Sequence, residues 1–114
     1  MQEMADVLVE VQLKAQLDAL ARCYFPRMNS IPALEVKEPS GDGPAWLDAT
    51  TGTIYIDKRV STFQEKTTRI LILHELIHWS LYLDNVSDPS DEKSDQFLGE
   101  LSRIKRLGAY NGLL

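Results

Sequence analysis

Apolar residues recur every three or four positions in three long stretches of the chain, and this spacing predicts three helices. The first helix covers residues 4–24 and ends before Pro26, because a proline ring cannot continue the hydrogen-bond ladder of a helix. The second covers residues 62–83 and is apolar almost all round, which is typical of a helix buried in the core. The third covers residues 89–107, with Gly108 as its stop signal.

Two β-favouring runs lie between the first and second helices. Residues 45–48 and 53–57 flank the turn 49–52, which is the pattern of a hairpin. A shorter alternating run at 34–36 predicts a further strand. We therefore expect an α+β fold with an N-terminal helix, a small antiparallel or mixed sheet with an edge hairpin, and two further helices. Residues 53–57 are expected to form the exposed edge, where an extended peptide could pair with the sheet.

The third helix has its own start signals. Asp88 is a residue type that caps helix N-termini, and Pro89 suits the first helical position. An acid in the first turn, Asp91, complements the helix dipole. Gly99, without a side chain, is expected to let this helix approach the second one closely.

Composition and charge narrow the class of protein. At 114 residues the chain is expected to form one domain over residues 1–114, and its content of 44% hydrophobic and 25% charged residues is ordinary for a globular protein. A net charge of −5 argues against nucleic acid as a partner, because phosphate binding needs clustered Lys and Arg.

The cellular compartment is indicated by the absence of a disulfide pair, a signal peptide and a membrane-spanning stretch from the sequence. The single cysteine, Cys23, excludes an internal disulfide, and it lies on the apolar side of the first helix, where we expect a buried thiol. Residues 1–10 lack the features of a signal peptide, and no window is long enough to span a bilayer. A cytoplasmic protein without a membrane partner is expected.

The two histidines are the residues that point to a chemistry. His74 and His78 stand four positions apart around Glu75, inside the second predicted helix. An α-helix repeats every 3.6 residues, so both imidazoles lie on one face and can bind one metal ion. Two histidines with this spacing are typical of a zinc site, and Glu75 can take a proton from a zinc-bound water. We therefore expect His74 and His78 as ligands of Zn²⁺ and Glu75 as the catalytic base.

A catalytic zinc ion normally has three protein ligands, and no histidine remains for the third position. A carboxylate is therefore expected. A short turn after the second helix predicts that the third helix runs back antiparallel, which places Asp95 level with His78. We favour Asp95 as third ligand, with Glu92, one turn nearer the loop, as runner-up. Six acids follow the motif within reach: Asp84, Asp88, Asp91, Glu92, Asp95 and Glu100.

The order of elements around the motif His74-Glu75-Leu76-Ile77-His78 resembles the zincin fold of metallopeptidases, in a minimal gluzincin-type form. The segments Gly43-Pro-Ala-Trp-Leu-Asp48 and Thr53-Ile-Tyr-Ile-Asp57 before the motif look like SprT-like proteases. Those proteases use a third histidine downstream, which this chain lacks.

The motif with Trp79, followed by Asp95-Gln-Phe-Leu-Gly-Glu-Leu101, is similar to antirestriction-type and ImmA/IrrE-like peptidase domains. That resemblance implies a third ligand from a glutamate on the last helix, whereas Asp95 stands near that place here. A metzincin pattern would use Asp84, but Leu81 stands where that family has glycine.

The leading hypothesis is a zinc metalloendopeptidase that cleaves a peptide or protein substrate. Two alternatives stay open. The chain could bind zinc as a regulatory or accessory module of bacterial or phage type that cleaves little, or it could be a latent peptidase whose cleft is filled by its N-terminal residues or closed by a dimer. Substrate preference and oligomeric state are not readable from the chain.

Overall fold

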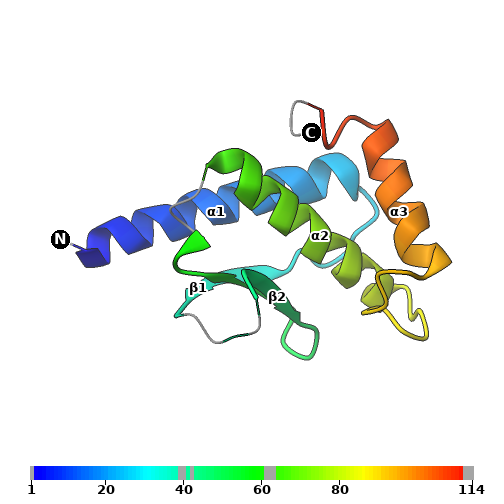
Figure 1. The fold of residues 1–114 in the computed structure, drawn as a ribbon, viewed down its shortest axis with the longest axis horizontal. Coiled ribbons are helices and arrows are strands. Elements are labelled where there is room, and N and C mark those ends of the chain that lie inside the picture. Colours follow the sequence, from blue (N-terminus) through cyan, green and yellow to red (C-terminus); the bar gives the residue numbers. More distant parts are fainter. Residues whose placement is uncertain (1, 39–40, 42, 61–63, 112–114) are drawn as a thin grey trace.

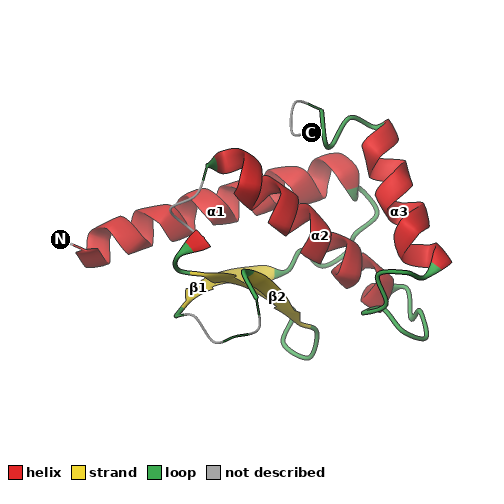
Figure 2. Ribbon diagram, in the orientation of Figure 1, coloured by secondary structure: helices red, strands yellow, loops and turns green. Residues whose placement is uncertain are grey.

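A computed structural model of the protein describes residues 2–38, 41, 43–60 and 64–111. Its architecture is α+β, with a long N-terminal helix, a three-stranded sheet and two further helices. Figures 1 and 2 show α1 and α2 on the same side of the sheet, with α3 near the C-terminal end of α2. The elements in chain order are α1 (Gln2–Tyr24), β1 (Ala33–Lys37), β2 (Ala45–Asp48), β3 (Thr53–Asp57), α2 (Glu65–Leu83) and α3 (Asp95–Arg106).

Helix α1 buries one face against β1 and α2, through side chains such as Leu17 and Tyr24. Cys23 lies on the other side of the helix and is exposed, so the predicted buried thiol is wrong. Leu20, Ala21 and Tyr24 are buried on one face of the helix. The helical period turns Cys23, which lies between Ala21 and Tyr24 in the sequence, toward solvent. Large apolar side chains of the early turns are also exposed, namely Val7, Leu8 and Val11.

The sheet is mixed, with the strand order β1-β3-β2. β3 pairs parallel with β1 and antiparallel with β2, so β3 is the central strand. The hairpin is confirmed, but the prediction that residues 53–57 form the exposed edge is wrong, because β1 covers that side. In the described part of the chain, β1 and β2 each pair with β3 alone and are the two edge strands, and α1 packs against β1. Ile54 and Ile56 of β3 have no exposed surface and anchor the sheet in the core.

Helix α2 forms the centre of the core, as its apolar sequence predicts. Its side chains Ile72, Leu73, Leu76 and Ile77 have no exposed surface. The described helix begins at Glu65, and the predicted start near residue 62 lies outside the described residues.

Helix α2 ends in a turn that reverses the chain. Asn85 adopts a left-handed conformation with φ 57° and donates its N–H to Tyr82 O at 3.1 Å. The Val86 N–H reaches back to Leu81 O at 3.2 Å, which completes a Schellman motif. This turn directs the following residues back along α2, toward the histidines.

Helix α3 begins at Asp95, later than the sequence predicts. Asp88 does not cap it, because its carboxylate accepts hydrogen bonds from the backbone N–H and the hydroxyl of Ser90 in a local turn. Ser94 is the N-cap, and its Oγ accepts the N–H of Phe97 at 3.1 Å. The predicted stop at Gly108 is confirmed, since this residue follows the helix with φ 91°. Residues 84–94 are therefore a loop.

None of the helices in the described ranges combines the length and the apolar character that crossing a membrane requires.

Candidate metal centre

The helical period brings the two histidines of α2 together, as predicted. Their Nε2 atoms lie 3.2 Å apart, and their ring centroids are separated by 4.8 Å. His74 keeps 37% of its side chain exposed, whereas His78 is buried. One face of the pair is thus open to solvent and the other faces the core.

The loop before α3 fixes the ring of His78. Its Nδ1 lies 2.7 Å from the carbonyl oxygen of Pro89. A carbonyl only accepts, so Nδ1 carries the proton and Nε2 keeps a free lone pair. A backbone carbonyl in this role is the usual partner of a metal-binding histidine, because it sets the tautomer and the ring orientation.

The third donor comes from the same loop. Glu92 Oε1 lies 2.8 Å from His74 Nε2 and 3.4 Å from His78 Nε2. The hydrogen bond from His74 holds the pKa of Glu92 below its usual range. His74, His78 and Glu92 form a group in which one donor atom from each lies within 4.8 Å of the other two.

This group fits a zinc ion in donor type and in spacing. Two imidazole nitrogens and one carboxylate oxygen are a ligand set that catalytic zinc sites use, with a fourth position open for water. Around a tetrahedral zinc with bonds of about 2.0–2.1 Å, neighbouring donor atoms lie about 3.3 Å apart. The separations of 3.2 and 3.4 Å to His78 Nε2 match this value, and the separation of 2.8 Å between His74 and Glu92 is shorter.

Of the two carboxylates favoured from the sequence, the structure brings Glu92 to the histidines. Asp95 is an exposed residue at the first position of α3 and does not belong to the group. The sequence predicts one helix over residues 89–107. In the structure Glu92 lies in the loop before α3, so the helical period does not set its position. The third donor therefore precedes the last helix and does not lie on it.

The remaining acids near the motif have other surroundings. Asp84 is the exposed C-cap of α2. Asp91 accepts the backbone N–H of Lys93, and Glu100 pairs with Arg103 at 2.9 Å. None of them belongs to the group formed by His74, His78 and Glu92.

Glu75 is a buried carboxyl group between the two histidines. It is 8% exposed and makes no hydrogen bond or ion pair to the residues that the structure describes. Burial raises the pKa of Glu75 to about 7, with a smaller upward contribution from the negative charge of Glu92 and a downward one from His78. The carboxylate oxygens of Glu75 are not fully enclosed and still touch solvent, and a mostly buried carboxyl group with a raised pKa beside the histidines is the strongest candidate for a chemical role.

Two aromatic residues support the group, and the sequence did not single them out for this role. Phe97 of α3 packs against both imidazoles, with ring centroids 5.3 Å from His74 and 4.9 Å from His78. Its place as the first apolar residue of the last helix predicts a core position and gives no signal for the site. The contribution of α3 to the site is therefore an aromatic wall.

The second aromatic residue is Trp79, which directly follows the motif. Its indole N–H donates to Ser30 O at 2.7 Å, and its ring lies against Gly52 in the hairpin turn. A Cβ at Gly52 would lie 3.2 Å from this ring, and the backbone there has φ 67°. Both the close contact and the left-handed conformation favour glycine at this position. Trp79 thereby ties the histidine-bearing part of α2 to the hairpin.

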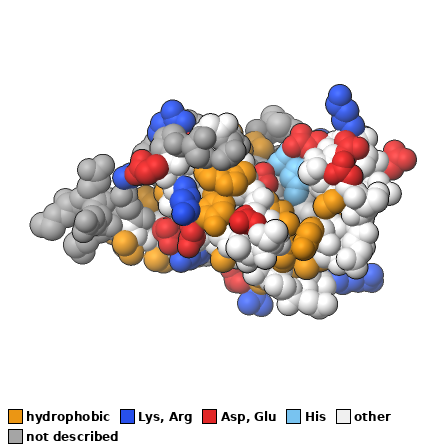
Figure 3. Space-filling model, turned by 90° about the horizontal axis from the view of Figure 1, so that it is seen from below, with side chains coloured by type: hydrophobic (Ala, Val, Ile, Leu, Met, Phe, Trp, Pro, Cys, Tyr) orange, Lys and Arg blue, Asp and Glu red, His pale blue; other side chains and the backbone are white. Residues whose placement is uncertain are grey.

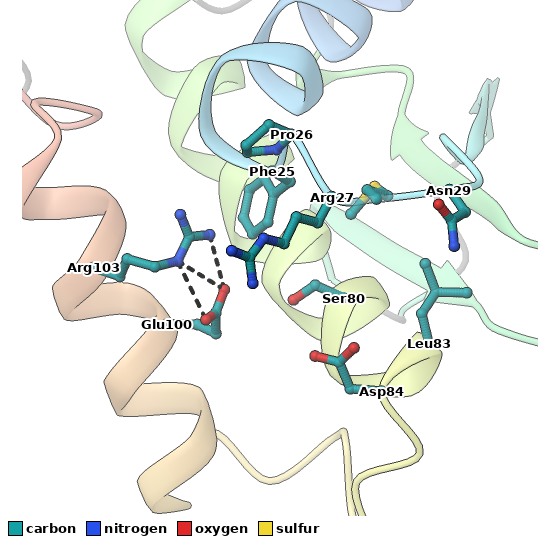
Figure 4. Close-up of a pocket in the computed structure, with 10 residues that line it drawn as sticks. Phe25, Pro26, Arg27, Asn29, Ser80, Leu83, Asp84, Glu100 and Arg103 are labelled. Carbon is teal, nitrogen blue, oxygen red and sulfur yellow. Dashed lines mark hydrogen bonds and ion pairs between the residues drawn. The ribbon is translucent and has the colours of Figure 1, made fainter.

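A separate pocket lies beside the last turn of α2. Its volume is about 660 Å³, and it opens between the segment after α1, α2 and α3. Figure 4 shows Arg27 extending into this space, near the paired side chains of Glu100 and Arg103. None of the residues of the histidine group lines it.

No protein-family model, curated protein or solved structure matches this chain.

Proposed function

We propose that the protein is a zinc-dependent metallopeptidase whose centre is formed by His74, Glu75, His78 and Glu92. The observation that carries this proposal is the pairing of a three-donor group with a buried, unpartnered carboxyl group on the adjacent helix position. A metal site alone needs no such carboxyl group, whereas hydrolysis of a peptide bond needs a base next to the ion.

Each of these residues would have its own role in the reaction. His74, His78 and Glu92 would hold the ion, and the Pro89 carbonyl would keep the Nε2 of His78 directed at it. When bound, zinc would lower the pKa of a water molecule and polarise the carbonyl of the substrate. Glu75 would accept the proton of the attacking water and pass it to the leaving amine.

The sheet offers a place for an extended peptide. β2 contacts α2, and its free edge is available for β-strand pairing in the described part of the chain. Gly52 in the hairpin turn packs against Trp79, the residue that follows His78, so this turn lies close to the histidine-bearing part of α2. A peptide paired with β2 would therefore lie near that part of α2.

This arrangement is similar to that of the zincins, with a helix carrying the motif above a strand at the edge of a sheet. The carboxylate donor favours a gluzincin-type site over the SprT-like type, which uses a third histidine. Glu92 lies in a loop, in contrast to the helical glutamate that the resemblance to ImmA/IrrE-like domains implies.

Substitution of the base tests the proposal. Glu75→Gln keeps the shape of the side chain and removes the proton acceptor, so we expect unchanged zinc content and a loss of cleavage of about 10²–10⁴-fold. The assay incubates the zinc-loaded protein with a peptide library from a digested proteome and reads new peptide termini by mass spectrometry. Glu35→Gln, which alters an exposed acid on β1 outside the group, is the matched control and should cleave like the parent.

Two outcomes would contradict the proposal. A Glu75→Gln protein as active as the parent would remove Glu75 from the mechanism. A zinc-loaded parent that cleaves nothing in the library would favour the alternative of a zinc-binding regulatory module.

A further inference from the structure

We infer that the site selects extended peptides carrying Lys or Arg beside the bond to be cleaved. This inference rests on the proposed function, because it concerns the substrate of the same site. It starts from the distribution of charge around the histidines.

Two segments lie beside the site, namely residues 43–56 with β2, which contacts α2, and residues 84–95 with Glu92. Together they hold six of the chain's 17 acidic residues and one of its 12 basic residues, Lys93. The remaining acidic and basic residues are equal in number, so these two segments account for the net charge of −5.

Three of these acids form what we call the acidic rim: Asp88, Asp91 and Asp95. All three are exposed. Asp88 precedes Pro89, whose carbonyl contacts His78, and Asp91 precedes Glu92. Asp95 begins the helix whose Phe97 packs on both imidazoles. Figure 3 shows the histidines reaching the surface with acidic side chains beside them.

The rim is not needed to hold the ion or to neutralise a charge of the chain. Glu92 already supplies the carboxylate of the donor group, and no ion pair joins a rim residue to a cation of the described chain. Glu75 is independently poised toward an outside partner, since it is buried beside the donor group without a hydrogen bond. A substrate lying over Glu75 and along β2 would pass within the field of the rim.

The size of the effect follows from distance. In water, two unit charges about 10 Å apart change a binding constant about twofold, and the net charge of +1 that a zinc ion and Glu92 would carry offsets one rim charge, so the rim favours a cationic side chain by about fourfold at low salt. Exposed charges at this distance are screened when salt shortens the Debye length to a few ångströms. The preference should therefore be a salt-sensitive one.

The test uses the full-length Glu75→Gln protein loaded with zinc and three fluorescent peptides. The peptides share one sequence and differ at one flanking position, which carries Lys, Gln or Glu. We expect the Lys peptide to bind about fourfold more tightly than the Gln peptide at about 20 mM salt, with the Glu peptide weakest, and the difference to disappear at about 500 mM salt. Fluorescence anisotropy gives the three dissociation constants.

A matched pair of variants separates the rim from net charge. Asp91→Asn with Asp95→Asn removes two rim charges, and Glu35→Gln with Glu65→Gln removes two exposed charges elsewhere, one of them also in the first turn of a helix. The first pair should lose most of the preference for Lys and the second should keep it.

Equal affinities for the three peptides, no binding of the Lys peptide, or equal effects of the two variant pairs would overturn the inference. Cleavage by the parent protein without any charge preference would overturn it and leave the proposed function intact. Charge-dependent binding without cleavage of any of the peptides would support it and count against the peptidase activity.

Discussion

His78 links helix α2 to the loop before α3 through both of its ring nitrogens. Nδ1–H donates to the Pro89 carbonyl at 2.7 Å, while Nε2 faces His74 and Glu92 at 3.2 and 3.4 Å. The same loop thus orients one donor and supplies another. Any displacement of this loop would disturb two of the three donors at once.

A second charged residue, Asp57 at the end of β3, has a structural role. Its side chain is 3% exposed and pairs with the Arg59 guanidinium at 2.8 Å, and it also accepts the Arg59 backbone N–H at 2.8 Å. The hydrogen bond from the Arg59 side chain holds the pKa of Asp57 below its usual range. A lowered pKa in the folded state means that the unfolded chain binds a proton more readily.

The stability that Asp57 contributes is therefore fully present above the ordinary aspartate pKa of about 3.9 and is lost as the pH falls through the lowered value. We expect Asp57→Asn to reduce the free energy of unfolding at about pH 7 and to flatten its decline toward about pH 2.5. Urea unfolding at a series of pH values measures both. Glu35→Gln, which removes an exposed carboxylate from the neighbouring strand, is the control, and an unchanged slope in Asp57→Asn would refute the assignment.

At the scale of residues, the sequence predicts what depends on local spacing. The pairing of His74 with His78 follows from the helical period alone. The choice between Asp95 and Glu92 does not, because it depends on where α3 begins. That position is set by the hydrogen bond from the Phe97 N–H to Ser94 Oγ, in competition with the turn at Asp88. Several residue types in this acidic segment can cap a helix, and the sequence does not rank them.

At the scale of elements, α3 contains one residue that the fold does not require. Gly99 was expected to allow a close approach of α3 to α2, but it is exposed, and a Cβ there would have no atom within 4 Å. The contact between the two helices is made instead by side chains such as Phe97 and Ile104, which are buried. Gly99 therefore adds flexibility to the unfolded chain without a packing benefit.

Gly99→Ala is expected to stabilise the protein by about 0.5–1 kcal/mol, because alanine favours the helix and restricts the unfolded chain. Urea unfolding at neutral pH measures the change. Gly52→Ala is the matched comparison with the opposite expected sign, since its φ of 67° and the 3.2 Å approach of Trp79 both disfavour a side chain. A loss of stability in Gly99→Ala would show that this face of α3 contacts something else.

Element types were predictable because each has a strong local signal. The apolar run of α2, the hairpin turn and the stop at Gly108 all agree with the structure. The sheet order was not predictable, because the parallel pairing of β1 with β3 joins segments that are far apart in the chain. As a result β3 is the central strand, and the edge strands are β1 and β2.

At the scale of the whole molecule, the site is assembled from parts that the fold brings together. α2 supplies His74, Glu75 and His78, the loop before α3 supplies Glu92, and the hairpin packs against Trp79. A bound ion would join α2 to the loop, so it would stabilise the folded chain by mass action.

The most direct measurement is the zinc affinity and stoichiometry of the metal-free protein, from competition with a chromophoric chelator at neutral pH. We expect one zinc ion per chain for the parent and for Asp95→Ala. Glu92→Ala should weaken binding by more than the 10–100-fold typical of substitutions outside the donor set. A parent protein that binds no stoichiometric zinc, or a loss of affinity in Asp95→Ala but not in Glu92→Ala, would contradict the assignment of His74, His78 and Glu92 as the metal centre.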